Sequence, residues 1–135
     1  MMGKLLEENL REPVHRFFEN KNYSVFDEVR LFQRGIDIIA KRRSTIIAVE
    51  LKMRNWRRAV QQACLDLRVS NYAFIALPET IWSRIDRRIY YEAYNHGIGL
   101  LSVDGEARQI MRPDRSKRIQ PSLRRSFLKR LQRIE

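Results

Sequence analysis

Residues 45–77 constrain the fold most, because they form a strand, a helix and a second strand in direct succession. Residues 45–53 are β-branched and apolar, which is typical of a buried strand. Residues 55–69 place apolar side chains at helical spacing, and residues 71–77 are a continuous apolar run that stops at Pro78. Two strands joined through a helix usually lie parallel. The segment therefore predicts an α/β fold with a parallel crossover.

The residues before this segment predict a helix followed by two further strands. Apolar side chains up to Phe18 follow helical spacing, and Pro13 either opens that helix at its first turn or kinks it. Residues 23–32 and 36–40 are strand-like, and the short turn at residues 41–44 predicts an antiparallel hairpin with the strand that follows.

After Pro78 we expect one more helix and one more strand. The helix is marked by Ile81, Trp82, Ile85 and Ile89 and should end at Gly97. Residues 98–103 are the strand, before a turn at Asp104 and Gly105. The predicted fold is a mixed β-sheet flanked by helices, in the order α-β-β-β-α-β-α-β, with a basic C-terminal helix.

The charge of the chain favours a polyanionic partner. Its 27 Lys and Arg residues against 16 Asp and Glu residues leave a net charge of +11 and a pI near 10.5, which suits nucleic acid. Solubility or a protein partner is the other explanation. The charge concentrates after residue 107, so we divide the chain into a core (1–107) and a basic extension (108–135) packed on the same domain. Ser122 is the expected cap of its helix.

Cys64 is the only cysteine, which excludes a disulfide framework and a zinc site of paired cysteines. The N-terminus has no apolar run of the secretory kind, and no apolar stretch is as long as a membrane span. These features predict a cytoplasmic protein with no membrane partner.

Asp37, Glu50 and Lys52 are the residues that best combine into a chemical site. Side chains two apart on a strand share a face, so Glu50 and Lys52 emerge together and Asp37 can approach them across the hairpin. Two carboxylates and the Leu51 carbonyl are oxygen ligands for a hard divalent cation, and Lys52 adds a positive charge. The alternative is that both acids are strand residues paired with Lys52 or nearby arginines. Glu50 ends an apolar run, however, where an unused charge is costly.

The chain resembles the PD-(D/E)xK nuclease superfamily in these residues, in the hairpin and in Gln62-Ala63 on the next helix. This superfamily includes restriction endonucleases and archaeal Holliday-junction resolvases. Residues 7–25, 75–78 and 97–103 are similar to small stand-alone members of uncharacterised function. The resemblance covers residues 7–103 and implies a restriction-endonuclease-like mixed β-sheet flanked by helices. Ile36 stands where the family name has proline, a common departure.

The resemblance implies a role for each matching residue. Asp37 and Glu50 would bind Mg²⁺, with Mn²⁺ as a substitute, and Lys52 would position the attacking water. Gln62 would help to hold the site. Many members use an acid from the first helix, for which helical phase favours Glu7 over Glu8 and Glu12. The alternative for Glu7 is an exposed first-turn acid favoured by the helix dipole.

The expected activity is hydrolysis of DNA phosphodiester bonds by water, with Mg²⁺ and without a covalent intermediate. The alternatives are a nuclease-fold domain that binds nucleic acid without cutting it, an RNA-binding protein, and cleavage of RNA. Many small members of the superfamily act as dimers, which leaves a homodimer open. The expected nucleic-acid contacts are Arg42, Arg43, Arg54, Arg57, Arg58, Arg124, Arg125 and Arg130.

Overall fold

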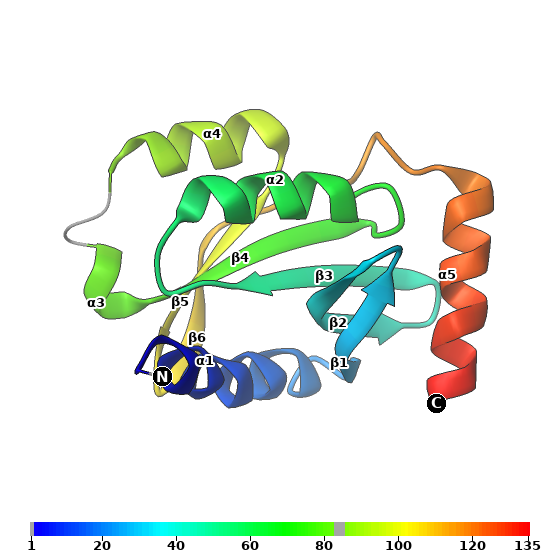
Figure 1. The fold of residues 1–135 in the computed structure, drawn as a ribbon, viewed down its shortest axis with the longest axis horizontal. Coiled ribbons are helices and arrows are strands. Elements are labelled where there is room, and N and C mark those ends of the chain that lie inside the picture. Colours follow the sequence, from blue (N-terminus) through cyan, green and yellow to red (C-terminus); the bar gives the residue numbers. More distant parts are fainter. Residues whose placement is uncertain (1, 83–85) are drawn as a thin grey trace.

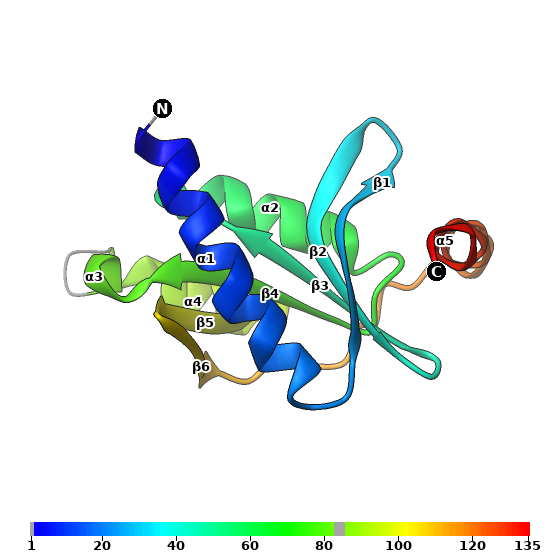
Figure 2. The same ribbon diagram turned by 90° about the horizontal axis from the view of Figure 1, so that it is seen from below.

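The computed structural model describes residues 2–82 and 86–135, with side chains described from residue 7 onward in the first helix. These residues form one six-stranded mixed sheet, in the order β1-β2-β3-β4-β5-β6, with helices on both faces (Figures 1 and 2). The strands are β1 (Ser24–Leu31), β2 (Arg34–Arg42), β3 (Thr45–Leu51), β4 (Tyr72–Pro78), β5 (Gly99–Asp104) and β6 (Glu106–Met111). The helices are α1 (Met2–Glu19), α2 (Trp56–Asp66), α3 (Glu79–Trp82), α4 (Arg88–His96) and α5 (Pro121–Ile134).

The strand pairing confirms the predicted hairpin and crossover. β1, β2 and β3 are antiparallel neighbours, and β3 pairs in parallel with β4 through α2. The turn between β2 and β3 contains Arg43 at φ 56°, and the turn before β2 contains Phe32 at φ 59°. Two-residue hairpin turns favour this left-handed backbone because it matches the twist of the strands.

The alternation of side chains along β3 separates two layers of the core. Ile47, Val49 and Leu51 pack under α1 with Leu10, Val14 and Phe18. Ile46 and Ala48 face the other side, where Phe127 and Leu131 attach α5 to the sheet. α2 and α4 cover β4 and β5 on the face opposite α1 (Figure 1). Because residues two apart share a face, Glu50 lies on the side of α2 and not on the side of α1.

Two helix predictions need correction, and one of the two alternatives for Pro13 is removed. The single helix expected near residues 81–96 is two helices, α3 and α4, and Ile85 lies outside the described residues. Pro13 lies inside α1, which begins at Met2, so it does not open the helix. Ser122 does not cap α5, because Pro121 begins the helix after Gln120; a proline at this position lacks only an N–H group that would have no helical partner. Gly97, at φ 71°, ends α4 as expected.

The sheet also has a strand that we did not predict. β6 pairs with β5 around Gly105, which has a φ of 69° and makes the expected turn. Most of its side chains are exposed, so it lacks the apolar alternation that marks the other strands. β6 spans the division that composition suggests at residue 107. Across residues 2–82 and 86–135, none of the helices has the length and apolarity needed to cross a membrane.

Candidate active site

Asp37 and Glu50 lie across from each other at one end of the β2–β3 pair. Ile38 pairs with Val49, and both side chains pack on the α1 face of the sheet. Asp37 and Glu50 are one pair further along the two strands, so they lie on the other face. Asp37 Oδ2 accepts a hydrogen bond from the Leu51 N–H at 2.8 Å. The Lys52 N–H donates to the Ala76 carbonyl at 3.1 Å, which continues the pairing past the end of β3. Half-buried Lys52 therefore shares the face of Glu50.

Burial raises the pKa of both carboxyl groups. Glu50 is only 2% exposed, and its pKa rises to about 9 because of burial first and of neighbouring Asp66 second, against the opposing effect of Arg34. The pKa of Asp37 rises to about 7, first through burial and then through the charge of Glu50, while the Leu51 N–H opposes the rise. Carboxyls with such pKa values are typical of functional sites, although structural ion pairs also produce them.

Arg34 and Asp66 complete this cluster, and neither is among the predicted residues. Arg34 Nη1 donates to Glu50 Oε2 at 3.2 Å, and Nη2 donates to Asp66 and to the Gln62 carbonyl, the latter at 3.0 Å. Asp66 is fully buried. Asp66 could have been found from sequence, because it is an acid three residues after Ala63 on the apolar face of a predicted helix. Arg34 follows a turn and matches no pattern.

The oxygen atoms of the cluster suit a hard cation. Gln62 Oε1 and Asp66 Oδ2 are buried and have no donor within hydrogen-bond distance among the described residues while the carboxyls are ionised. A protonated Glu50 would donate to Asp66, which is the arrangement that its raised pKa favours without metal. Over the described ranges, no group of three or more His, Cys, Asp or Glu side chains is positioned to hold a metal ion. A cation here would therefore need backbone carbonyl and water ligands as well.

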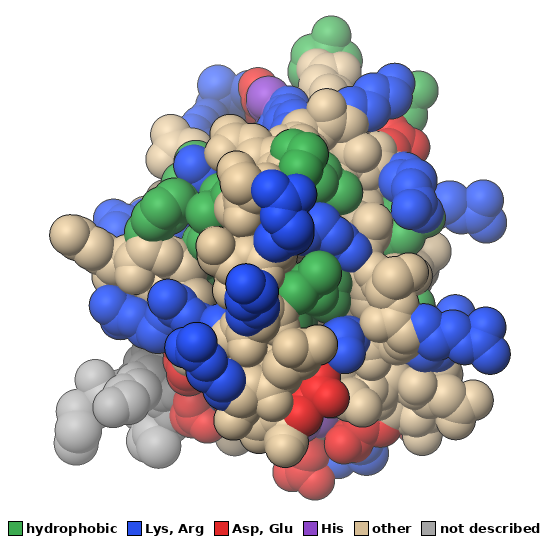
Figure 3. Space-filling view, turned by 90° about the vertical axis from the view of Figure 1, so that its right-hand side faces the viewer, with side chains coloured by type: hydrophobic (Ala, Val, Ile, Leu, Met, Phe, Trp, Pro, Cys, Tyr) green, Lys and Arg blue, Asp and Glu red, His purple; other side chains and the backbone are tan. Residues whose placement is uncertain are grey.

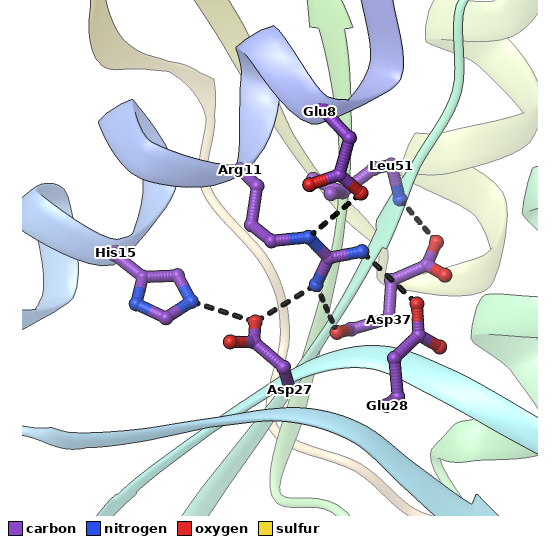
Figure 4. A network of polar contacts seen from close by, with 7 residues as sticks. All are labelled: Glu8, Arg11, His15, Asp27, Glu28, Asp37 and Leu51. Carbon is purple, nitrogen blue, oxygen red and sulfur yellow. Dashed lines mark hydrogen bonds and ion pairs between the residues drawn. The ribbon is translucent and has the colours of Figure 1, made fainter. Parts of the chain in front are cut away.

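A second polar network ties α1 to the backbone of Asp37 (Figure 4). Arg11 Nη1 donates to the Asp37 carbonyl and to Asp27 Oδ1, both at 2.8 Å, and Nη2 donates to Glu28 at 3.0 Å. His15 contacts Asp27 at 2.7 Å. The Asp37 carboxyl points away from Arg11 toward Leu51 in the same view. The network therefore holds the Asp37 backbone from the α1 side.

The structure does not join Glu7 to the cluster. Glu7 is half-buried and has no hydrogen bond or ion pair with another described side chain. Glu8 contacts Arg11 at 3.4 Å and so reaches the Asp37 backbone indirectly, and Glu12 pairs with Arg16. A role for Glu7 in the site stays a prediction, and Glu8 is linked to the Asp37 backbone through Arg11.

The predicted nucleic-acid contacts fall into separate places. Arg54, Arg57 and Arg58 are exposed around the start of α2, beside the end of β3 that carries Glu50. Arg42 and Arg43 lie at the other end of the hairpin, roughly 20 Å from Glu50 at about 3.3 Å per residue. Arg42 and Arg43 therefore lie away from Glu50, and Arg54, Arg57 and Arg58 lie beside it.

Two arginines of α5 have structural contacts. Arg124 donates to the carbonyls of Val69 at 2.7 Å and Ser44 at 2.5 Å, and Arg130 donates to the Arg30 carbonyl at 3.0 Å. Both hold α5 against the sheet. Arg125 is exposed, and Lys and Arg side chains spread over the side of the molecule on which α5 lies (Figure 3).

Comparison with known proteins shows the fold. No family model and no curated protein matches the chain. A protein of unknown function from Silicibacter pomeroyi, SPO1766, has a TM-score of 0.73 at 16% identity, over 95% of this chain and 84% of that one. An XisH family protein from Nostoc punctiforme has a TM-score of 0.51 at 14% identity, over 78% and 97%. Pyrococcus furiosus SfsA in complex with Ca²⁺ has a TM-score of 0.50 at 14% identity, over 82% and 64%. The chain has a restriction-endonuclease-like fold.

Proposed function

We propose that this chain is a divalent-metal-dependent nuclease of the PD-(D/E)xK superfamily that hydrolyses phosphodiester bonds in DNA. One observation carries the proposal: Asp37 and Glu50 face each other across β2 and β3, with Lys52 on the same face. Both carboxyls are held at raised pKa values, at a cost to stability that a bound cation would relieve. The solved structure of SfsA contains Ca²⁺, which supports a cation in a fold of this kind.

Asp37, Glu50 and the Leu51 carbonyl would hold Mg²⁺ or Mn²⁺. When bound, the ion supplies charge stabilisation to the phosphate and lowers the pKa of water. Lys52 would hold the attacking water by hydrogen bonding and offset phosphate charge. The side chains of Arg54, Arg57 and Arg58 would bind phosphates on either side of the cut bond.

One observation favours the second candidate function, a domain that binds nucleic acid without cutting it. Arg34 already bonds to Glu50 and Asp66 from within the chain, so the cluster has an internal cation where a nuclease would bind a metal. In the nuclease, DNA and metal together must outcompete Arg34 for Glu50. In the binding domain, Arg34 remains paired with Glu50, and neither Mg²⁺ nor Mn²⁺ produces cleavage.

Replacing Lys52 with alanine tests the catalytic arrangement. We expect the cleavage rate at saturating DNA to fall by about a hundredfold or more, the usual effect of removing a positioned proton-handling group. The affinity for DNA should fall by much less, because Lys52 is only one of several basic side chains near the site that could contact phosphate. Single-turnover rates and binding isotherms measure the two effects separately. An equal reduction of rate and affinity would make Lys52 a phosphate contact only.

Arg125 and Arg133 test whether the exposed side of α5 binds DNA. Replacing both with glutamine should weaken binding to all sequences alike and reduce the slope of log affinity against log salt by about 0.9 for each phosphate that the chain no longer neutralises. Cleavage at saturating DNA should persist, since neither residue lies in the acid cluster. Arg124 and Arg130 are left intact because their bonds hold α5 in place. An unchanged slope would assign this surface to another partner.

A further inference from the structure

A hollow separate from the acid cluster lies on the α1 face, at the end of β3 and β4 opposite Glu50. It is a groove of about 410 Å³ between the end of α1, the first residues of β4 and the segment after β6. Figure 2 shows α1 running across this face of the sheet. Grooves of this volume are large enough for a small organic ligand. Nothing in the acid cluster reaches it, because Glu50 faces α2.

The walls of the groove are aromatic. Its floor is formed by buried Phe18, Ile47 and Phe74, and its walls by half-buried Tyr23 and Tyr72, with Phe17 beside them. Arg42 lies 4.6 Å from the ring centre of Tyr23, and Lys21 lies 4.5 Å from that of Phe17. Both cations are exposed, and Arg42 also donates to the Lys21 carbonyl at 2.8 Å, so positive charge lies directly over two of the aromatic rings.

The rim of the groove is positively charged. Lys21, Arg112 and Arg115 line it, against a single acid, Asp114. A smaller hollow of about 150 Å³ shares Asp114 and Arg115 and adds Lys117 and Arg118. Burial and the charge of Arg115 both lower the pKa of the Arg124 guanidinium, so Arg115 lies near Arg124. The positive charge therefore continues from the groove toward α5.

We propose that this groove binds a nucleotide whose base is unpaired and unstacked, with the base against Tyr23 and Tyr72 and the phosphate at Arg112 and Arg115. Aromatic walls recognise any base through its π-face, and a basic rim recognises the phosphate. A base inside a duplex has no free face, so duplex DNA does not fit. The ligand is a nucleotide within a single strand or a free mononucleotide. Binding of this kind does not require the acid cluster to be catalytic.

Fluorescence of 2-aminopurine tests this site without metal. A short single-stranded DNA with one central 2-aminopurine is titrated with the full chain in EDTA, alongside the same strand annealed to its complement. We expect the chain to quench the single strand and not the duplex. Tyr72→Leu should weaken single-strand binding by about tenfold, the effect of removing one base–aromatic stack. Tyr91→Leu is the matched control, because Tyr91 is 68% exposed on α4, outside the residues that line the groove.

A rim variant keeps the test valid if Tyr72→Leu fails to fold. Arg112→Gln with Arg115→Gln leaves the floor intact and should reduce the salt slope by about 0.7 for each phosphate contact on a single strand. Competition by dAMP separates the two sources of the nucleotide. If dAMP displaces the single strand at a concentration equal to that of the strand, the ligand is a free nucleotide. If it does not displace the strand, the ligand is a nucleotide within a single strand. Equal quenching of strand and duplex would overturn the proposal. So would parent-like binding by folded Tyr72→Leu, or by the rim variant. Because metal is absent, these results do not depend on cleavage.

Discussion

Replacing Glu50 with glutamine is expected to abolish cleavage and, without metal, to stabilise the folded chain at pH 8. The pKa of Glu50 is about 9 in the folded chain, above the usual value near 4.3 in an unfolded chain. Between these values the folded state binds more protons, so stability falls as pH rises. Glutamine does not titrate and removes this pH-dependent decrease. We expect a gain of about 1 kcal/mol or more at pH 8 and almost none at pH 4.

Urea unfolding at pH 4 and pH 8 measures the stability effect. Asp37→Asn should change stability in the same direction over a narrower range, because the pKa of Asp37 rises only to about 7. Glu106→Gln is the control, since Glu106 is exposed on β6. A Glu50→Gln variant that is less stable than the parent at pH 8 would mean that the pair with Arg34 outweighs the cost of burying the charge.

Replacing Arg34 with methionine is expected to destabilise the chain by about 3–5 kcal/mol at pH 8, the cost of leaving a buried charge without its partner. Glu50 and Asp66 would then be buried with no cation between them. Arg34 lowers the pKa of Asp66, so its loss favours the protonated carboxyl, and the destabilisation should become smaller as pH falls. Arg57→Met is the matched control, because Arg57 is exposed and pairs with Asp86 only at 3.7 Å.

The same variant separates the two candidate functions. If the cluster is a metal site, Mg²⁺ or Mn²⁺ should restore part of the stability that Arg34→Met removes, because a cation then occupies the place next to Glu50. A triple variant that also carries Glu50→Gln and Asp66→Asn should recover stability without metal. No recovery with either cation would favour the domain that binds without cutting.

Local patterns predicted most of the fold. β3 and β4 are apolar runs, and α2 between them has an apolar face, so the parallel crossover followed from sequence. β6 was missed because its exposed side chains leave no apolar alternation. The helix around residues 81–96 was predicted as one element because apolar spacing does not reveal the break between α3 and α4.

The candidate site was only partly predictable. Strand alternation was enough to place Asp37, Glu50 and Lys52 on one face. Arg34 could not be found in this way, because its bonds to Glu50 and Asp66 depend on how a hairpin turn packs against α2. The bonds of Arg124 to Val69 and Ser44 likewise join residues far apart in the chain. A charged side of a helix looks the same in sequence whether its arginines bind carbonyls or phosphates.

The most direct measurement is a cleavage assay of the parent chain and the Glu50→Gln variant, purified in parallel. Plasmid, branched and single-stranded DNA are each incubated with Mg²⁺, with Mn²⁺ and with EDTA. We predict that the parent cuts at least one of these DNAs with Mg²⁺ or Mn²⁺ and none in EDTA, and that the folded variant cuts none while still binding DNA. Cleavage by the variant at the rate of the parent, or no cleavage by the parent with either metal on any of the three DNAs, would contradict a metal-dependent nuclease site at Asp37, Glu50 and Lys52.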